Sequence, residues 1–183
     1  LRDAFFQVSS IITTTGYSTA NYDTWPTFSK GILFILMFIG GCAGSTAGGM
    51  KCIRILVALK MIKREIMKIF HPRAVVPVKL GHKVLSNDML ISISSFSILY
   101  ILIFVLSTLA VSLEGVDLVS ASSAVAATLG NIGIGLGLAG PAHTFSQFSE
   151  LSKVIFSFLM LVGRLELFTV LALFSKKFWK NEF

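Results

Sequence analysis

The stretch AFFQVSSIITTTGYS, residues 4–18, recurs in modified form as ASSAVAATLGNIGIG, residues 121–135. Three identities support this alignment, each between residues 117 positions apart: Ala4 with Ala121, Val8 with Val125 and Gly16 with Gly133. The same offset aligns residues 27–29 with 144–146, and after a six-residue insertion residues 36–41 align with 159–164. The chain is therefore predicted to contain one unit twice: a short apolar segment, a glycine-containing stretch, a loop and a long apolar span.

The composition of the 183-residue chain indicates an integral membrane protein. Hydrophobic residues make up 54% of it, charged residues only 14%, and the mean hydropathy is +0.81. Residues 89–113 carry no charge, which is enough chain to cross a hydrocarbon layer about 30 Å thick. Residues 31–50 are also uncharged, and residues 154–174 contain only two charged side chains. A soluble core of the same composition would need polar faces that these runs lack.

The short apolar segments 3–12 and 118–129 are too short to span a bilayer as helices. Each covers roughly 16 Å, so we expect it to enter from the outside and return as extended backbone. Irregular backbone at membrane depth has to line a cavity, where its carbonyl groups can bind a cation. The predicted selectivity filter is Thr14, Thr15, Gly16 and Tyr17 with Asn131, Ile132, Gly133 and Ile134. The alternative is that TTTG forms an ordinary polar turn.

The apolar span after the first of these segments is interrupted by GGCAGSTAGG, residues 40–49. Five glycines in ten residues predict a break between two half-helices, 32–39 and 50–62. Repeated GxxxG spacing leaves close helix packing as the alternative. An intramembrane serine protease built on Ser45 would need a histidine in a span, and none of the apolar runs contains one. The predicted gate comprises Gly40, Gly41, Gly44, Ser45, Gly48, Gly49 and Arg164.

Arg164 joins this set because the repeat aligns it with Gly41, which predicts a position near the middle of the last span. A charge at that depth is costly and usually faces a cavity. We expect Arg164 to meet the loop of residues 40–49 below the filter, although a salt bridge to another segment is the alternative. Glu166 lies only two residues further on, so it points to another face of the helix.

The net charge of +7 is distributed as in a membrane protein rather than a nucleic-acid-binding protein. Nine basic residues lie within residues 51–83, and three more follow the last apolar span. The positive-inside rule predicts that residues 51–83 and the C-terminus are cytoplasmic. Loops around the acidic residues Asp3, Asp23, Glu114, Asp117 and Glu150 are then predicted to lie outside.

The motifs MFIGGCAGSTAGGMKCIRIL, HPRAVVPVKLG, NIGIGLG and GRLELFTVL resemble the C-terminal half of TrkH-type bacterial potassium uptake proteins, in the Trk/Ktr/HKT cation transporter superfamily. The resemblance implies an all-α integral membrane fold with repeats of outer helix, pore helix and inner helix around one pore. It divides the chain into a third repeat (1–70), a cytoplasmic basic linker (71–88) and a fourth repeat (89–183). It maps the filter glycines onto Gly16 and Gly133, the gating loop onto residues 40–49 and the inner-helix arginine onto Arg164.

The resemblance further implies potassium as the transported ion, bound at Thr14, Thr15, Gly16, Asn131, Ile132 and Gly133, and a protein that is not an enzyme. It implies no cofactor in this chain, and a nucleotide only through a regulatory subunit. The implied partners are the N-terminal half of the same polypeptide, a second copy in a homodimer, a cytosolic TrkA-type subunit and the bilayer, without nucleic acid. The implied location is the bacterial inner membrane. An ion-coupled secondary transporter is the alternative, with Glu166 as the carboxylate to watch.

Overall fold

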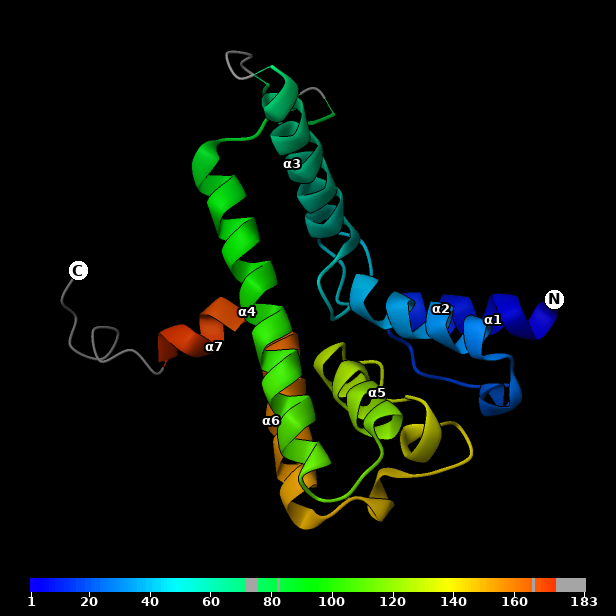
Figure 1. Ribbon diagram of the computed structural model, residues 1–183. Coiled ribbons are helices and arrows are strands. Elements are labelled where there is room, and N and C mark those ends of the chain that lie inside the picture. Colours follow the sequence, from blue (N-terminus) through cyan, green and yellow to red (C-terminus); the bar gives the residue numbers. More distant parts are fainter. Residues whose placement is uncertain (72–75, 82, 166, 174–183) are drawn as a thin grey trace.

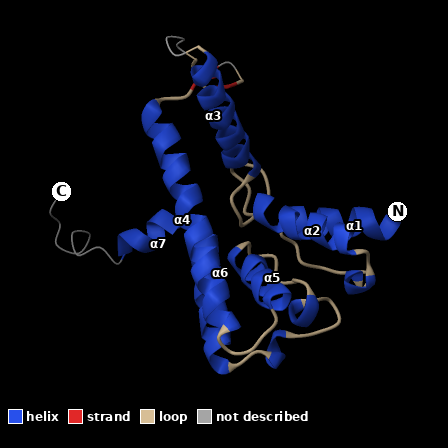
Figure 2. Ribbon diagram, viewed as in Figure 1, coloured by secondary structure: helices blue, strands red, loops and turns tan. Residues whose placement is uncertain are grey.

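Helices dominate the computed structural model, which describes residues 1–71, 76–81, 83–165 and 167–173 (Figures 1 and 2). The α-helices are α1 (Arg2–Ile12), α2 (Thr27–Ile39), α3 (Cys52–Phe70), α4 (Asn87–Ser112), α5 (Leu118–Leu129), α6 (Glu150–Leu165) and α7 (Leu167–Leu173). Short 3-10 turns cover Tyr22–Thr24 (η1), Gly137–Ala139 (η2) and Phe145–Gln147 (η3). One feature was not predicted: β1 (Lys79–Leu80) pairs antiparallel with β2 (Lys83–Val84) at the end of the α3–α4 pair.

The two copies of the repeated unit fold alike. Helices α1 and α5 end at Ile12 and Leu129, 117 residues apart, as the alignment predicts. Helices α2 and α6 begin at Thr27 and Glu150, 123 residues apart, so the six-residue insertion precedes this helix. The predicted alignment of residues 27–29 with 144–146 is therefore wrong, because the first set begins α2 and the second lies before α6 begins.

One helix of the described chain, α4, is long and apolar enough to cross a membrane. The shorter apolar helices α2 and α5 do not reach that length. Figure 1 shows α3 and α4 side by side, with α6 alongside the far half of α4 and α5 between these helices and the α1–α2 pair. This arrangement places α5 where several other elements can cover it.

Helix α5 owes its central position to its small side chains. Nine of its residues are buried, and most of them are alanine or serine. Their small volume lets α4, α6 and α2 approach the α5 backbone closely. One core cluster joins α5 to α4 and α6 through Val125, Tyr100 and Leu159, and a second joins it to α1 and α2 through Ala126 and Met37.

Two predicted helix boundaries are wrong. The second half-helix was expected to end near residue 62, but α3 continues to Phe70. No glycine or proline interrupts this stretch, and Glu65 pairs with Lys68 one turn further on. The last span was expected to run as one segment, but α6 ends at Leu165 and α7 runs in a different direction (Figure 1). Arg164 lies in the last described turn of α6, close to this change of direction.

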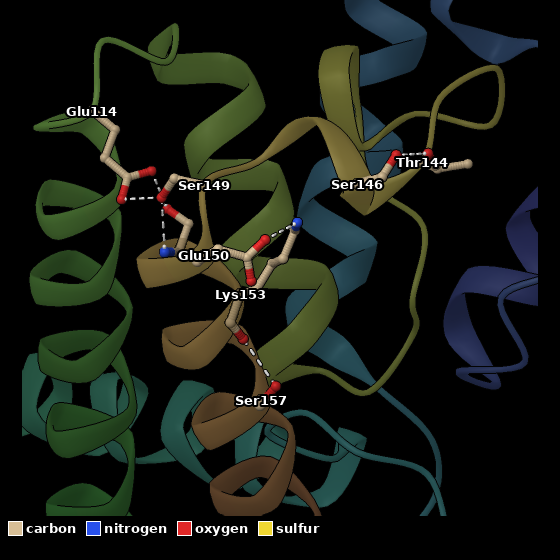
Figure 3. A network of polar contacts seen from close by, with 8 residues as sticks. Glu114, Thr144, Ser146, Ser149, Glu150, Lys153 and Ser157 are labelled. Carbon is tan, nitrogen blue, oxygen red and sulfur yellow. Dashed lines mark hydrogen bonds and ion pairs between the residues drawn. The ribbon is translucent and has the colours of Figure 1, made fainter.

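The outer end of α4 is tied to the start of α6 by a carboxylate (Figure 3). The hydroxyl groups of Ser149 and Ser152 donate to Glu114 at 2.5 and 2.6 Å. Ser149 also accepts from the backbone N–H of Ser152, which satisfies a free donor in the first turn of α6. These hydrogen bonds favour the ionised carboxylate, so they lower the pKa of Glu114.

This lowered pKa predicts acid sensitivity at the α4–α6 junction. The stabilisation from Glu114 is present above its ordinary pKa of 4.5 and is lost as pH falls through the lowered value. We expect Glu114→Gln to lower the melting temperature at pH 7. Below pH 4.5, the melting temperature of the variant should fall less steeply with pH than that of wild type. Thermal unfolding from pH 3 to 7 measures both effects. Glu150→Gln is the control, because the ion pair that the structure describes for Glu150 is with Lys153 of the same helix; an equal change in both variants would contradict the prediction.

Candidate functional site

The ends of α1 and α5 carry two turns with the same backbone conformation. Thr14 and Asn131 have φ angles of 56° and 54°, and Gly16 and Gly133 have φ angles of 76° and 92°. Four backbone hydrogen bonds recur between equivalent atoms: 13→9, 14→11, 15→10 and 16→10 in the first turn, and 130→126, 131→128, 132→127 and 133→127 in the second. The predicted filter segments are thus two copies of one structure, and a left-handed conformation at their shared position explains the glycine.

The two turns touch each other through main-chain atoms. A Cβ atom added to Gly16 would lie 1.9 Å from the carbonyl oxygen of Ile132. Gly133 differs, because no described atom lies within 4 Å of its equivalent position. The structure therefore brings the two predicted filter segments together along one edge and leaves Gly133 facing open space among the described residues.

Polar side chains of the short helices, which were not among the predicted site residues, hold the extended segments that return from the turns. Buried Gln7 lies 3.0 Å from the Ser18 hydroxyl, and Ser10 donates to the Tyr17 carbonyl at 2.6 Å. In the second copy, the buried Ser123 hydroxyl bonds both the N–H and the carbonyl of Leu136. The hydrogen bond from Ser10 occupies the carbonyl group of Tyr17, which is a predicted filter residue. The sequence signal was the presence of polar residues within otherwise apolar helices.

A second set of contacts joins the two copies across the outer side. The hydroxyl of Tyr22, which is completely buried, donates to the Gly135 carbonyl at 2.7 Å. The neighbouring Asp23 carboxylate accepts from the Gly137 backbone N–H at 3.0 Å. An acidic residue expected in an outer loop therefore supports η2, which follows the second filter segment.

The glycine-rich residues 40–51 form a compact loop whose two ends meet. The N–H of Met50 donates to the Phe38 carbonyl, and that of Cys52 to the Gly41 carbonyl, at 3.2 and 3.1 Å. A Cβ atom on Gly40 would lie 2.4 Å from the Gly48 carbonyl oxygen. The predicted break between α2 and α3 is thus confirmed, and the close approach of its backbone segments accounts for the absence of side chains at these positions.

This loop packs against the inner end of α5. A Cβ atom on Gly48 would lie 2.2 Å from the Gly130 carbonyl oxygen. A Cβ atom on Gly163, in α6, would lie 2.1 Å from the Leu129 carbonyl oxygen. The ends of the loop are buried here, whereas its tip, which includes Gly44 and Ser45, is exposed. The loop therefore meets the start of the second predicted filter segment through Gly48.

Arg164 reaches the tip of the loop and donates to the Thr46 carbonyl. Both border a cavity of about 220 Å³, which is also lined by Lys51, Arg54 and Tyr100. The Arg54 guanidinium lies 3.8 Å from the centroid of the Phe96 ring on α4. The predicted meeting of Arg164 with residues 40–49 therefore occurs, while Glu166 lies outside the described residues.

The chemistry of this site is that of backbone carbonyl groups. Within the described residues, no group of three His, Cys, Asp or Glu side chains is placed to hold a metal ion. The C-terminal end of α5 adds the partial negative charge of its last carbonyl groups. At its outer end, hydrogen bonds from Ser120 lower the pKa of Asp117, which caps the helix as a carboxylate. Such a site can stabilise a dehydrated cation.

Comparison with known proteins places these observations in a family. The family model described as TrkH, cation transport protein, matches residues 1–182. The Trk system potassium uptake protein TrkH of Halomonas elongata is 46% identical over 181 residues, which is 99% of this chain and 37% of that protein. The Trk system potassium uptake protein TrkG of Escherichia coli is 37% identical over 178 residues, 97% of this chain and 36% of that protein.

A solved structure has the same fold. The crystal structure of the potassium transporter TrkH from Vibrio parahaemolyticus matches with a TM-score of 0.87 and 44% sequence identity. The match covers 97% of this chain and 37% of that chain. The chain therefore spans a little over a third of the length of the relatives it matches.

Proposed function

Because this chain belongs to the TrkH cation transport family, we propose that it supplies two of four walls of a pore that conducts potassium ions across a membrane. The two walls are the repeats 1–70 and 89–183, joined by the linker 71–88. Two filter segments cannot surround an ion, so the remaining two walls come from an N-terminal half of the same polypeptide. The relatives named as potassium uptake proteins, which are much longer than this chain, support this division.

One observation carries the proposal: the turns after α1 and α5 share their φ angles and four backbone hydrogen bonds, and they lie against each other. An ion pathway built from repeated segments needs carbonyl groups at the same positions in each segment. Glycines that serve only close helix packing would need no such match. The proposed potassium ligands are the backbone carbonyl groups of Thr14, Thr15, Gly16, Asn131, Ile132 and Gly133. Tyr17 and Ile134 complete the filter segments.

The proposed gate is the loop of residues 40–49 with Arg164. The loop lies below the second filter segment, and the Arg164–Thr46 hydrogen bond holds its tip near the end of α6. A positive charge below a cation filter raises the barrier for potassium. Conduction then requires the loop and the guanidinium to move out of the pathway.

The proposed setting is a bacterial inner membrane crossed several times, with residues 51–83 and the C-terminus on the cytoplasmic side. The proposed partners are a second copy of the polypeptide and a cytosolic TrkA-type subunit that carries any regulatory nucleotide. The acidic loops at the other end, including Asp23 and Glu114, would attract cations toward the entrance.

The test is a current measurement on the complete polypeptide in planar bilayers. A passive pore predicts a reversal potential that follows the potassium gradient alone. Imposing a tenfold proton or sodium gradient at symmetric potassium would leave that potential at zero. A shifted potential would instead support a coupled transporter, and Glu166→Gln would then be the first variant to examine.

A further inference from the structure

The inner half of α3 and the β-hairpin enclose a basic pocket that the transport mechanism does not use. Its volume is about 270 Å³, and it lies between α3 and the segment that leads into β1. Four basic residues line it: Lys60, Lys63, Arg64 and Lys79. Its remaining walls are apolar and consist of Met67, Val76, Pro77 and Val78. This combination suits a ligand that presents an anionic group beside hydrocarbon.

Part of the basic charge is already balanced. Arg64 and Lys68 both pair with Glu65, at 3.0 and 3.1 Å, and Lys60 donates to the Lys79 carbonyl at 2.7 Å. Because Lys60 donates to a neutral carbonyl group, this hydrogen bond does not neutralise its positive charge. The pocket therefore keeps an excess of positive charge, mainly from its lysines.

Two mainly apolar spaces between α3 and α4, close to the pocket, form what we call the α3–α4 groove. Arg64 lines both the pocket and a neighbouring space of about 410 Å³ against the first turns of α4. Met61, Ser94 and Ile98 connect that space to a further one of about 490 Å³. Exposed apolar side chains flank this groove, including Ile62, Ile66 and Ile69. A free phosphate ion would leave the groove empty, whereas an acyl chain would fill it.

The position of the pocket relative to the membrane favours a lipid over a cytosolic partner as its ligand. In the proposed orientation, α3 starts near the membrane centre, because the loop before it contacts the inner end of α5. Lys60 and Arg64 follow Cys52 by eight and twelve residues, which places them about 12 and 18 Å further along the helix. Half of a hydrocarbon layer measures about 15 Å, so the pocket lies at the level of the inner headgroups.

We propose that this pocket binds the phosphate of an anionic phospholipid, with one acyl chain lying in the α3–α4 groove. The proposal rests on the membrane orientation given in the proposed function. It assigns a ligand to residues that lie outside the filter and the gate. Juxtamembrane basic residues attract anionic lipid strongly enough for such a preference.

The test compares lipids of identical chains on the complete polypeptide in detergent, with native mass spectrometry as the readout. Phosphatidylglycerol should bind more tightly than phosphatidylcholine. The double variant Lys60→Gln/Lys63→Gln should weaken the phosphatidylglycerol affinity about 30-fold, since each basic residue contributes about a factor of five. Lys63→Gln alone should weaken it about fivefold and does not disturb the Lys60–Lys79 contact. Lys153→Gln, on α6 at the opposite end, is the matched control and should bind as wild type does.

Each other outcome contradicts the proposal. Equal affinity for phosphatidylglycerol and phosphatidylcholine would show that the site has no headgroup preference. If the double variant still bound phosphatidylglycerol as tightly as wild type, the lipid site would lie elsewhere. Competition by millimolar inorganic phosphate would identify a site for free anions. If a second copy of the polypeptide occupied this pocket in the dimer, lipid would bind only to the monomer. Potassium currents of the same variants in phosphatidylcholine bilayers should match wild type, so failure of the lipid site remains distinct from failure of the pore.

Discussion

Gly16→Ala is expected to abolish selective potassium transport, because a Cβ atom there would lie 1.9 Å from the Ile132 carbonyl oxygen. Real contacts of this kind are at least 3.0 Å, so the two filter segments would have to separate by about 1 Å. The φ angle of 76° adds a penalty of roughly 1–2 kcal/mol for a residue with a side chain. Rubidium uptake into proteoliposomes, with potassium or sodium as competitor, measures the loss of both rate and preference.

Two other glycines make this prediction specific. Gly133→Ala places the same strain at a φ angle of 92° but meets no described atom within 4 Å, so we expect reduced preference with measurable uptake. Gly31→Ala lies within α2, also meets no described atom, and should behave as wild type. Equal uptake and equal preference in all three variants would mean that these turns do not contact the ion. If Gly16→Ala fails to fold, Gly133→Ala alone decides the role of the filter.

Arg164→Ala is expected to raise the potassium flux, because it removes both the charge and the hydrogen bond that holds the loop at Thr46. An unpaired charge at membrane depth costs roughly 3 kcal/mol, which limits the acceleration to about 100-fold. Because the Thr46 carbonyl partly compensates the guanidinium, we expect roughly a tenfold increase. Single-channel or vesicle flux measurements under a fixed potassium gradient provide the test.

Conservative variants of Arg164 separate the effect of its positive charge from that of its hydrogen bond to Thr46. Arg164→Lys keeps the charge and one donor, so its flux should stay near that of wild type. Arg164→Gln keeps a donor without the charge, and its flux should lie between those of wild type and Arg164→Ala. Lower flux in Arg164→Ala, with normal stability, would show that the arginine supports conduction instead of limiting it.

Local signals made the short helices predictable. Asp117 caps the start of α5, and Gly130 follows its last residue, so the predicted and observed bounds coincide at 118–129. The length of this helix and the glycine after it already indicated backbone that turns back within the membrane. The same reasoning located the break after Ile39, because a dense run of glycines cannot continue a helix.

Boundaries without such signals were predicted poorly. Nothing near residue 62 ends α3, and no proline marks the change of direction between α6 and α7. The bridge from Tyr22 to the Gly135 carbonyl was not predicted either, although it links residues 113 positions apart. The hydroxyl group of a buried tyrosine needs a hydrogen-bond acceptor, but the amino-acid sequence does not indicate which carbonyl group will lie near it.

The sequence by itself determined the membrane composition, the duplication and the break in the helix after Ile39. These properties depend on residue type and on neighbours a few positions away, through hydropathy, helix length and the steric freedom of glycine. Only the tertiary structure decided which backbone segments face each other: Gly16 against Ile132, and Gly48 against the end of α5. Such contacts depend on how closely the helices approach, which is set by packing across the whole chain.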